Sequence, residues 1–267
     1  MQTKTITYKG KPASYLIAGA GKPVVLLHGF GETVSVWRRQ IEALEALCQL
    51  IIPGIPGGGL SEFNAELTSL DDYAYLLKEI LQAEGIKSCV LFGHSMGGYI
   101  ALSFAARFPE MLLAMGLIHS SAFADNGDKI ATRKKSIDFI RAHDAAEYFN
   151  TSIPGLFSEE TILKEPSLPR ELINSVSDLL PAALAQQQQA MIDRPDRTDM
   201  LRMFDKPVLF IIGQYDKAVP FEAAMKQCYL PAVSHVHILR HSGHMGMWEE
   251  REKTNAAMAG FLAAIEQ

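Results

Sequence analysis

The sequence predicts an α/β fold, in which helices cover both faces of a parallel β-sheet. Two observations lead to this prediction. Short runs of continuously apolar residues, typical of parallel strands buried on both faces, recur along the chain. Longer segments between them carry apolar residues three or four positions apart, the spacing of a helix that packs on a sheet. Strands and helices that alternate in this way form a parallel sheet.

Length and composition fit one globular unit with an inserted segment. The 267 residues can bury a large core, and 48% apolar with 21% charged residues is ordinary globular composition. The formal net charge of −5 argues against a sequence-independent nucleic-acid binder, because such proteins carry a surplus of basic residues. We therefore expect a small-molecule substrate and no nucleic-acid partner, while the sequence leaves the oligomeric state open.

The cysteines and the N-terminus bear on the compartment. Cys48, Cys89 and Cys228 are odd in number and widely spaced, which predicts buried free thiols rather than disulfides or metal ligands. Residues 1–8 lack the charged-then-apolar pattern of an export signal. No apolar run approaches the ~18 residues of a membrane span. We expect a cytoplasmic protein with no membrane partner.

The N-terminal part of the chain supplies the first strands and helices. Ser69 followed by Asp72 resembles a capping box, and Gly85 closes the helix that begins there. The predicted elements are a hairpin of residues 3–8 and 14–18, strands at 24–27 and 50–52, and helices over 37–47 and 70–84.

A reactive serine is predicted where the next strand ends. The apolar run 89–92 leads into Gly93, His94, Ser95, Met96 and Gly97, and a helical pattern follows up to residue 109. A serine that stands clear of its backbone needs a tight, strained turn, and the residues two before and two after it must be nearly free of side chains. Because strand, turn and helix are all present, we interpret Ser95 as a nucleophile.

The alternation stops after the strand predicted at 112–118. Residues 120–203 are polar, contain several prolines and show no convincing strand, so we predict a mostly helical cap inserted into a core of residues 1–119 and 204–267. Within the cap we expect residues 186–189 to form a solvated helix face and residues 133–135 to be surface charge. The core then resumes with strands at 208–212 and 236–239 and helices over 221–229 and 249–265.

A serine nucleophile needs a histidine base, and the histidine needs a carboxylate to hold its tautomer. In a parallel sheet these groups lie in loops at the carboxyl ends of the strands. Asp216 follows the strand 208–212, and His244 lies in the loop after the last strand. Serine, acid and histidine in this chain order are typical of a nucleophile on such a turn.

Other side chains compete for both roles. His241 is the serious rival for the base, although Gly243 beside His244 favours His244, since a small neighbour lets the ring turn inward. Asp125 and Asp128, at the entrance to the cap, compete with Asp216. His119 ends a strand but lies before the cap, and structural or surface roles suit the remaining candidates, His143, His235 and His237.

The oxyanion that forms during acyl transfer needs two preorganised donors. The backbone N–H of Met96, at the start of the helix, is one candidate. The N–H of Phe30, in the loop after residues 24–27, is the other. His28 is interpreted as structural, its ring fixing that loop.

Together these residues resemble the α/β-hydrolase superfamily, from about Lys11 to the C-terminus apart from the cap, in its branch of small esterases, enol-lactonases and C–C bond hydrolases. The resemblance implies an eight-stranded, mostly parallel sheet, no cofactor or metal, and Ser95, Asp216 and His244 as the triad. Members of this branch usually carry an aspartate and a histidine in the turn after the third core strand. Gly54 and Gly58 stand there instead, which leaves the subfamily open.

The sequence thus predicts a serine hydrolase that cleaves a small carboxylic ester or lactone through an acyl-enzyme. A C–C bond hydrolase acting on a diketone would use the same triad, and a ligand receptor could retain it without turnover. The physiological substrate and chain-length preference stay open. Candidate pocket residues are Phe30, Trp37, Met96, Phe123, Phe149, Phe157, Met191 and Val219.

Overall fold

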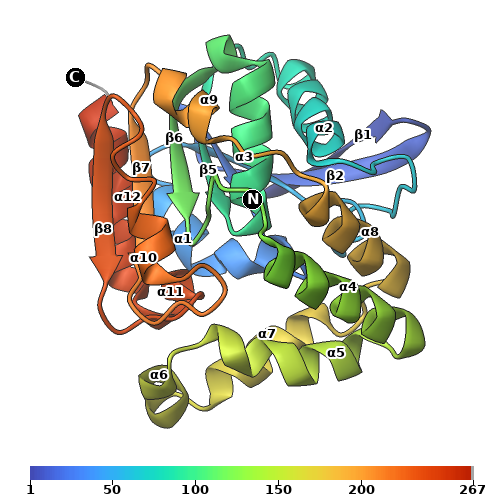
Figure 1. The fold of residues 1–267 in the computed structure, drawn as a ribbon. Coiled ribbons are helices and arrows are strands. Elements are labelled where there is room, and N and C mark those ends of the chain that lie inside the picture. The colour runs from blue at the N-terminus through green and yellow to red at the C-terminus, as the bar shows by residue number, and fades with distance from the viewer. Residues whose placement is uncertain (266–267) are drawn as a thin grey trace.

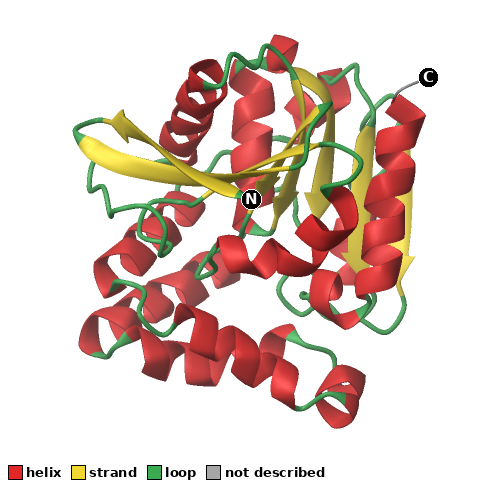
Figure 2. Ribbon diagram, turned by 180° about the vertical axis from the view of Figure 1, so that it is seen from behind, coloured by secondary structure: helices red, strands yellow, loops and turns green. Residues whose placement is uncertain are grey.

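A computed structural model of the chain describes residues 1–265, which form an eight-stranded sheet with the strand order β1-β2-β4-β3-β5-β6-β7-β8. The β1–β2 and β2–β4 pairs are antiparallel and all the others are parallel. The predicted sheet is confirmed, including its leading hairpin, which Figure 2 shows as a twisted ribbon at one edge. The strands are β1 (Gln2–Tyr8), β2 (Lys11–Ala18), β3 (Pro23–Leu27), β4 (Gln49–Pro53), β5 (Cys89–His94), β6 (Leu112–Ile118), β7 (Val208–Gly213) and β8 (Ser234–Leu239).

Helices cover both faces of this sheet, as predicted (Figure 1). One core cluster joins α2, α3, α9 (Thr198–Met203) and α10 to one face, and a second joins α1, α11 and α12 to the other. The core helices are α1 (Arg38–Leu44), α2 (Leu70–Ala83), α3 (Met96–Arg107), α10 (Phe221–Met225), α11 (Gly246–Glu249) and α12 (Arg251–Ile265), with short 3-10 turns η1 (Val34–Trp37) and η2 (Pro109–Met111).

The strand order reverses at β3, which pairs with β4 on one side and β5 on the other. The chain leaves β3 toward α1 on one face of the sheet and leaves β5 toward α3 on the other face. The loops that follow β3 and β5 therefore part in opposite directions. Crevices of this kind, at the carboxyl ends of the strands, are where open α/β sheets bind ligands.

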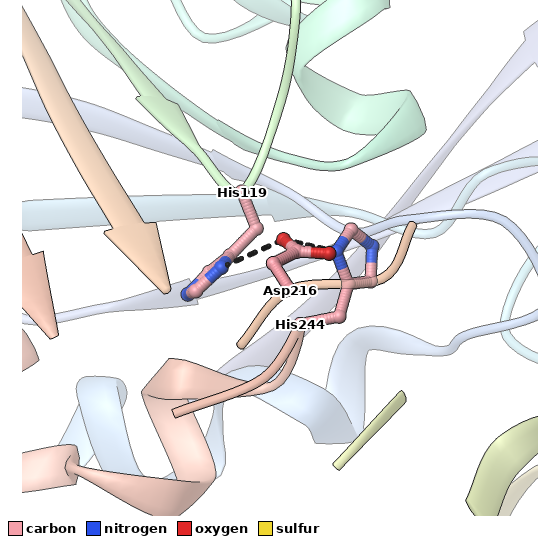
Figure 3. A group of neighbouring side chains, drawn as sticks. All are labelled: His119, Asp216 and His244. Atoms are coloured by element: carbon pink, nitrogen blue, oxygen red, sulfur yellow. Dashed lines mark hydrogen bonds and ion pairs between the residues drawn. The ribbon is translucent and has the colours of Figure 1, made fainter. Parts of the chain in front are cut away.

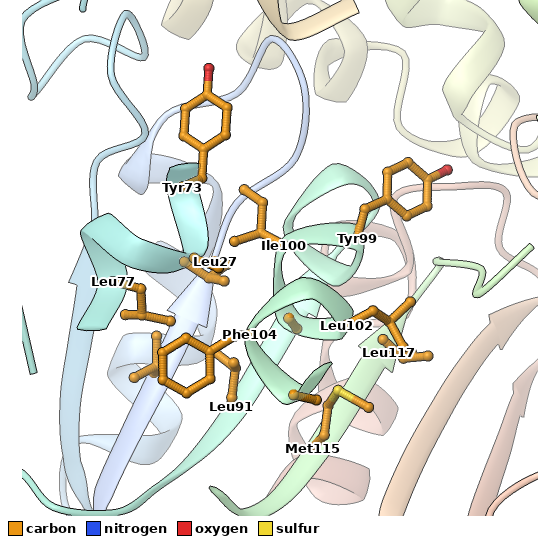
Figure 4. Packing of buried hydrophobic residues seen from close by; sticks show 14 of the residues in the cluster. Leu27, Tyr73, Leu77, Leu91, Tyr99, Ile100, Leu102, Phe104, Met115 and Leu117 are labelled. Carbon is orange, nitrogen blue, oxygen red and sulfur yellow. The ribbon is translucent and has the colours of Figure 1, made fainter. Parts of the chain in front are cut away.

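Helix α3 is held firmly at the centre of the fold. Figure 4 shows Ile100 and Phe104 on the side of α3 that faces Leu27 and Leu77, while Leu102 lies toward Leu117. Every residue from Met96 to Ala105 is buried. Because packed interiors resist small displacements, the first turn of α3 gives any group mounted on it a fixed position.

Six helices and a 3-10 turn lie between β6 and β7, and residues 120–203 contain no strand among the described part of the chain. In Figure 1 the arrowheads of β6 and β8 point toward the layer of α4, α5, α6 and α7. This layer faces the carboxyl end of the sheet. The elements are α4 (Gly127–Ala142), α5 (Ala145–Ser152), η3 (Ile153–Leu156), α6 (Glu159–Lys164), α7 (Ser167–Val176), α8 (Pro181–Ile192) and α9 (Thr198–Met203).

Two expectations for this inserted segment are wrong in part. Gln187 and Gln188 are buried rather than solvated, because α8 packs between α4 and the core, and Gln188 accepts a hydrogen bond from Arg133. Arg133 is itself mostly buried and paired with Asp125, whereas Lys134 and Lys135 are exposed as expected.

The ends of three core elements also differ from prediction. The helix predicted over 37–47 begins as η1 and continues as α1, and the one predicted over 221–229 is the short α10. The last helix is interrupted at Glu250, whose φ of −126° and ψ of 55° are not helical, so α11 and α12 are separate. Periodicity places such helices but does not resolve their breaks.

All three cysteines are buried free thiols, as predicted. Burial raises the pKa of Cys89 to about 12, so this thiol stays protonated and unreactive. None of the helices within residues 1–265 combines the length and apolar composition that a bilayer span requires.

The predicted capping box at α2 is present. The Ser69 hydroxyl accepts a hydrogen bond from the Asp72 N–H at 3.2 Å, and the Asp72 carboxylate accepts one from the Ser69 N–H at 3.0 Å. We expect Ser69→Ala to lower the free energy of unfolding by about 1 kcal/mol, measured by urea denaturation. Ser175→Ala, at an exposed position near the end of α7, is the matched control and should change it by a few tenths at most.

Candidate active site

Ser95 occupies a strained turn between β5 and α3. Its φ of 51° and ψ of −116° lie in a region that residues with side chains rarely adopt. The turn is possible because of two glycines. A Cβ on Gly93 would lie 2.3 Å from the Gly97 carbonyl oxygen, and one on Gly97 would lie 2.3 Å from the Leu27 carbonyl oxygen. This is the strand–turn–helix context that a nucleophile elbow requires.

The turn is anchored through the backbone of Ser95. Its N–H donates to the Ile118 carbonyl oxygen at 3.0 Å, and its own carbonyl oxygen accepts from the Ser120 hydroxyl at 2.8 Å. Both partners belong to the end of β6 and the loop after it. The hydroxyl of Ser95 is therefore held above the first turn of α3 by an unusual but fully bonded backbone.

Asp216 lies in the loop after β7 and accepts four hydrogen bonds. Its Oδ1 accepts from the N–H groups of Ala218 and Val219, each at 2.8 Å. Its Oδ2 accepts from Nδ1 of His244 at 2.8 Å and Nδ1 of His119 at 3.2 Å (Figure 3). Burial works to raise the pKa of Asp216, but the adjacent imidazoles outweigh it and hold that pKa well below its ordinary value. Asp216 is thus a buried carboxylate.

His119 was considered from sequence only as a rival base, and its contact with Asp216 was missed. Its ring is fully buried, and burial lowers its pKa to about 4 despite the neighbouring carboxylate. Nε2 accepts a hydrogen bond from the Gly246 N–H at 3.2 Å, so the neutral ring carries its proton on Nδ1. The only sequence signal is a histidine directly after β6, the strand that pairs with β7.

His119, Asp216 and His244 offer ligand atoms within 4.8 Å of one another, a geometry compatible with a metal ion. The hydrogen bonds argue against this use. A metal on Nδ1 of neutral His119 would place the proton on Nε2, against the Gly246 N–H that already points there. The cluster fits a hydrogen-bond network and does not fit a metal centre.

His244 is carried by a loop whose backbone is fastened on two sides. Its N–H donates to the Leu156 carbonyl oxygen of η3 at 2.6 Å. Glu249 Oε1 accepts from the N–H groups of Gly243 and Met245, and its Oε2 accepts from the Ser158 N–H at 2.8 Å. One carboxylate therefore joins the loop of His244 to the inserted helices.

His28 fixes the loop after β3 that contains Phe30. Its Nε2 accepts from the Ile55 N–H at 3.0 Å, so Nδ1 carries the proton and donates to the Gly29 carbonyl oxygen, also at 3.0 Å. Burial lowers the pKa of His28, in keeping with this neutral tautomer. The Gly29 carbonyl and the Phe30 N–H belong to one planar trans peptide, so the bond sets the direction of that N–H.

A buried pair, Glu32 and His94, links three loops. The Glu32 carboxylate accepts from Nδ1 of His94 at 3.0 Å and from the Gly29 N–H at 2.5 Å. Nε2 of His94 donates to the His244 carbonyl oxygen at 3.0 Å. Burial disfavours both charges, but the pair's mutual attraction overcomes it, lowering the pKa of Glu32 and raising that of His94. Both ring nitrogens of His94 face oxygen acceptors, and this geometry fits an imidazolium paired with a carboxylate.

This pair also brings the candidate base to the elbow. His94 directly precedes Ser95, and its ring centroid lies 4.9 Å from that of His244. Of the candidate triad, the structure joins Asp216 and His244 by a hydrogen bond and places His244 against the residue before Ser95.

The rival candidates lie in other environments. His241 is exposed and bonded to Glu160 at 2.8 Å, and His143 is paired with Glu147. Asp125 is enclosed by Arg133 and Arg194, which hold its pKa below the ordinary value against the effect of burial, while Asp128 is an exposed residue in the first turn of α4. None of these groups contacts Asp216 or His244 through a described hydrogen bond.

The predicted pocket residues divide into two groups. Phe30 packs edge-to-face with Tyr148 at 6.1 Å between centroids, and α5 also places Phe149 where a side chain on Gly31 would stand. The inserted helices therefore cover the loop after β3. Six of the eight are buried core residues: Trp37, Met96, Phe149, Phe157, Met191 and Val219.

The chain belongs to the alpha/beta hydrolase fold family, whose sequence model matches residues 22–251. The resemblance found in the sequence is therefore confirmed at the level of the superfamily. The chain is similar over its whole length to a thermophilic esterase from Thermogutta terrifontis, with a TM-score of 0.94, 25% identity and 100% of each chain covered.

Two further relatives are a hydrolase and a component of an acetoin cleaving system. The chain is 26% identical to a 2-hydroxy-6-oxononadienedioate/2-hydroxy-6-oxononatrienedioate hydrolase from Klebsiella pneumoniae, with 92% of this chain and 88% of that protein covered. It is 28% identical to a dihydrolipoyllysine-residue acetyltransferase component of an acetoin cleaving system from Pseudomonas putida. That match covers 91% of this chain but 64% of the relative's length.

Removing Glu32 tests the buried pair. We expect Glu32→Ala to lower the free energy of unfolding by about 3 to 5 kcal/mol, because it leaves a buried imidazolium without its partner. The raised pKa of His94 contributes stability that is present below its ordinary value of 6.5 and is lost as pH rises through the folded value. The lowered pKa of Glu32 contributes above 4.5.

The destabilisation should therefore be largest at about pH 5.5, between the ordinary pKa values of the two groups, and should shrink as pH rises through the folded pKa of His94. Urea unfolding at a series of pH values measures it. Glu171→Ala, which removes an exposed partner of Arg38, is the control and should cost about 1 kcal/mol or less. Equal costs for the two substitutions would contradict a buried ion pair.

Proposed function

We propose that the protein is a serine hydrolase that cleaves a small carboxylic ester or lactone, with Ser95, His244 and Asp216 as its triad. The observation that carries the proposal has two parts. Ser95 lies on a strained elbow directly after His94, whose ring packs against that of His244, and Nδ1 of His244 is bonded to the buried carboxylate of Asp216. This is the set of groups that converts an unreactive hydroxyl into a nucleophile.

The hydrogen bonds of His244 support one route for the proton. Nδ1 of His244 donates to Asp216, so Nε2 is the free lone pair that accepts the proton of the Ser95 hydroxyl. The Ser95 oxygen attacks the carbonyl carbon, and the resulting tetrahedral intermediate breaks its bond to the leaving oxygen, which takes the proton from His244. Water, activated by the same imidazole, then attacks the acyl-enzyme and restores Ser95.

Two amides are assigned to the oxyanion. The N–H of Met96 lies at the first position of α3, where the helix supplies no partner for it and its dipole favours negative charge. The N–H of Phe30 is oriented by His28 through the Gly29 carbonyl. Removing one donor of this kind typically costs about 3 to 4 kcal/mol of transition-state stabilisation.

The relatives support the hydrolysis of an ester and one alternative reaction. The esterase from Thermogutta terrifontis aligns over the full length of both chains. The Klebsiella pneumoniae relative is named as a hydrolase of an oxo-dienedioate, which favours, as second candidate, hydrolysis of a C–C bond in a diketone. Both reactions use the same three side chains, so the substrate must decide between them.

Replacing the nucleophile is the direct test. We expect Ser95→Ala to lower kcat/KM on p-nitrophenyl acetate and butyrate by at least about 1,000-fold, while thermal unfolding stays near that of wild type. Ser121→Ala, in the loop after β6, is a control hydroxyl outside the proposed triad and should retain activity. Turnover that survives in Ser95→Ala would sink the assignment.

A substrate panel separates the two candidates. Purified wild type should hydrolyse short p-nitrophenyl esters or small lactones faster than vinylogous 1,5-diketones, each followed by absorbance at several concentrations. If only the diketones are turned over, and this turnover depends on Ser95, the protein is a C–C bond hydrolase rather than an esterase. The proposed triad would be unaffected by that result.

A further inference from the structure

We propose that His119 is a positioning residue that tunes the proton affinity of His244, by donating a second hydrogen bond to the same oxygen of Asp216. The inference rests on the proposed function, since it concerns how strongly the proposed base holds its proton. His119 would touch neither substrate nor the reacting atoms and would act through Asp216.

Apart from the bond to His119, the hydrogen bonds of the Asp216 carboxylate are set by its own loop and by His244. Both Oδ1 contacts come from backbone N–H groups of the loop that carries Asp216, at 2.8 Å, and cannot be withdrawn without moving that loop. Oδ2 is shared between His244 and His119. His119 is therefore the one side chain besides His244 that is described as bonding to the acid.

The ring of His119 is fixed in the orientation that this bond needs. Gly246 donates to its Nε2, and a Cβ on Gly246 would lie 2.4 Å from that atom. A Cβ on Gly213 would lie 3.0 Å from Cε1 of the same ring. His119 also has a φ of 48°, which a residue with a side chain adopts only when its surroundings require it. Close packing by Gly213 and Gly246 and the strained backbone of His119 thus keep its imidazole in contact with Asp216.

The electrostatic consequence has a definite sign. A carboxylate oxygen that accepts from His119 has less negative charge to offer to His244, so the protonated form of His244 is stabilised less than it would be by Asp216 alone. Removing the His119 donor should make the carboxylate a stronger partner for imidazolium. His244 would then hold its proton to higher pH, and activity would begin at higher pH.

Other charged groups face His244 and must stay unchanged in the test. The imidazolium of His94, paired with Glu32, lies on its β5 side. Glu249 of α11 bonds to the backbone on both sides of His244. Asp216 and His119 complete the set of titratable side chains described around this ring.

Two substitutions separate the contacts of His119. The amide nitrogen of His119→Asn occupies the place of Nδ1, so this variant retains the donor to Asp216 and loses the acceptor for Gly246; asparagine also tolerates a positive φ. The amide of His119→Gln lies at the place of Nε2, so this variant retains a partner for Gly246 and loses the donor to Asp216. His143→Gln, at an exposed histidine bonded to Glu147, is the control.

The primary readout is the titration of His244, followed by NMR of protein labelled on histidine and assigned with His244→Gln. The second is the acid limb of kcat/KM for p-nitrophenyl acetate. We expect His119→Gln to move both midpoints upward by about 0.5 to 1 pH unit. His119→Asn and His143→Gln should stay within about 0.2 unit of wild type. If His119→Gln does not fold, His119→Ala, which lacks both contacts, takes its place as the variant without a donor to Asp216.

Midpoints that are equal in all variants, or that move equally in the Asn and Gln variants, would overturn the proposal, because a merely structural role does not distinguish the two contacts. The NMR titration needs no turnover. If wild type hydrolyses no ester while the titration midpoints follow the expected pattern, the proposed function fails and the role of His119 stands. If Ser95-dependent turnover is present but the midpoints do not follow that pattern, the proposed function stands and the role of His119 fails.

Discussion

Polar side chains buried at the carboxyl edge of the sheet must find hydrogen-bond partners, and this requirement joins five loops into one unit. Glu32 and His94 connect the loop after β3 with the end of β5 and with the backbone of His244. Asp216 connects the loops after β7, β6 and β8 through His119 and His244. An unpaired polar group at such depth costs about 1 to 3 kcal/mol, and more when it is charged, so the loops hold one another in place.

The same network reaches the inserted helices. Glu249 bonds to Ser158 at the start of α6 and to the backbone beside His244, and the His244 N–H bonds to Leu156. Phe30 packs against Tyr148 of α5. The candidate base and one candidate oxyanion donor are therefore both in contact with the segment between β6 and β7. A substitution in that segment that alters substrate preference should therefore also shift the positions of the candidate base and the candidate oxyanion donor.

Much of the fold follows from the sequence, since apolar runs mark buried strands and glycines mark the elbow. Ser95, Asp216 and His244 were named from chain order and from their places after strands. The role of His119 and the Glu32–His94 pair could not be named, because partners such as His119 and Asp216 are 97 positions apart and meet only when β6 and β7 pair. Gln187 and Gln188 were misplaced for a related reason. Polar residues on a helix indicate solvent until the packing of α8 against α4 is known.

The catalytic role of Ser95 is the central claim, and its chemical reactivity is the most direct measure of it. Wild-type protein would be treated with a fluorophosphonate, weighed intact by mass spectrometry, and digested to locate the adduct. One phosphonyl group per chain, on Ser95 and dependent on His244, is the result expected. Folded protein that stays unmodified, or an adduct on another residue, would contradict a serine nucleophile on this elbow.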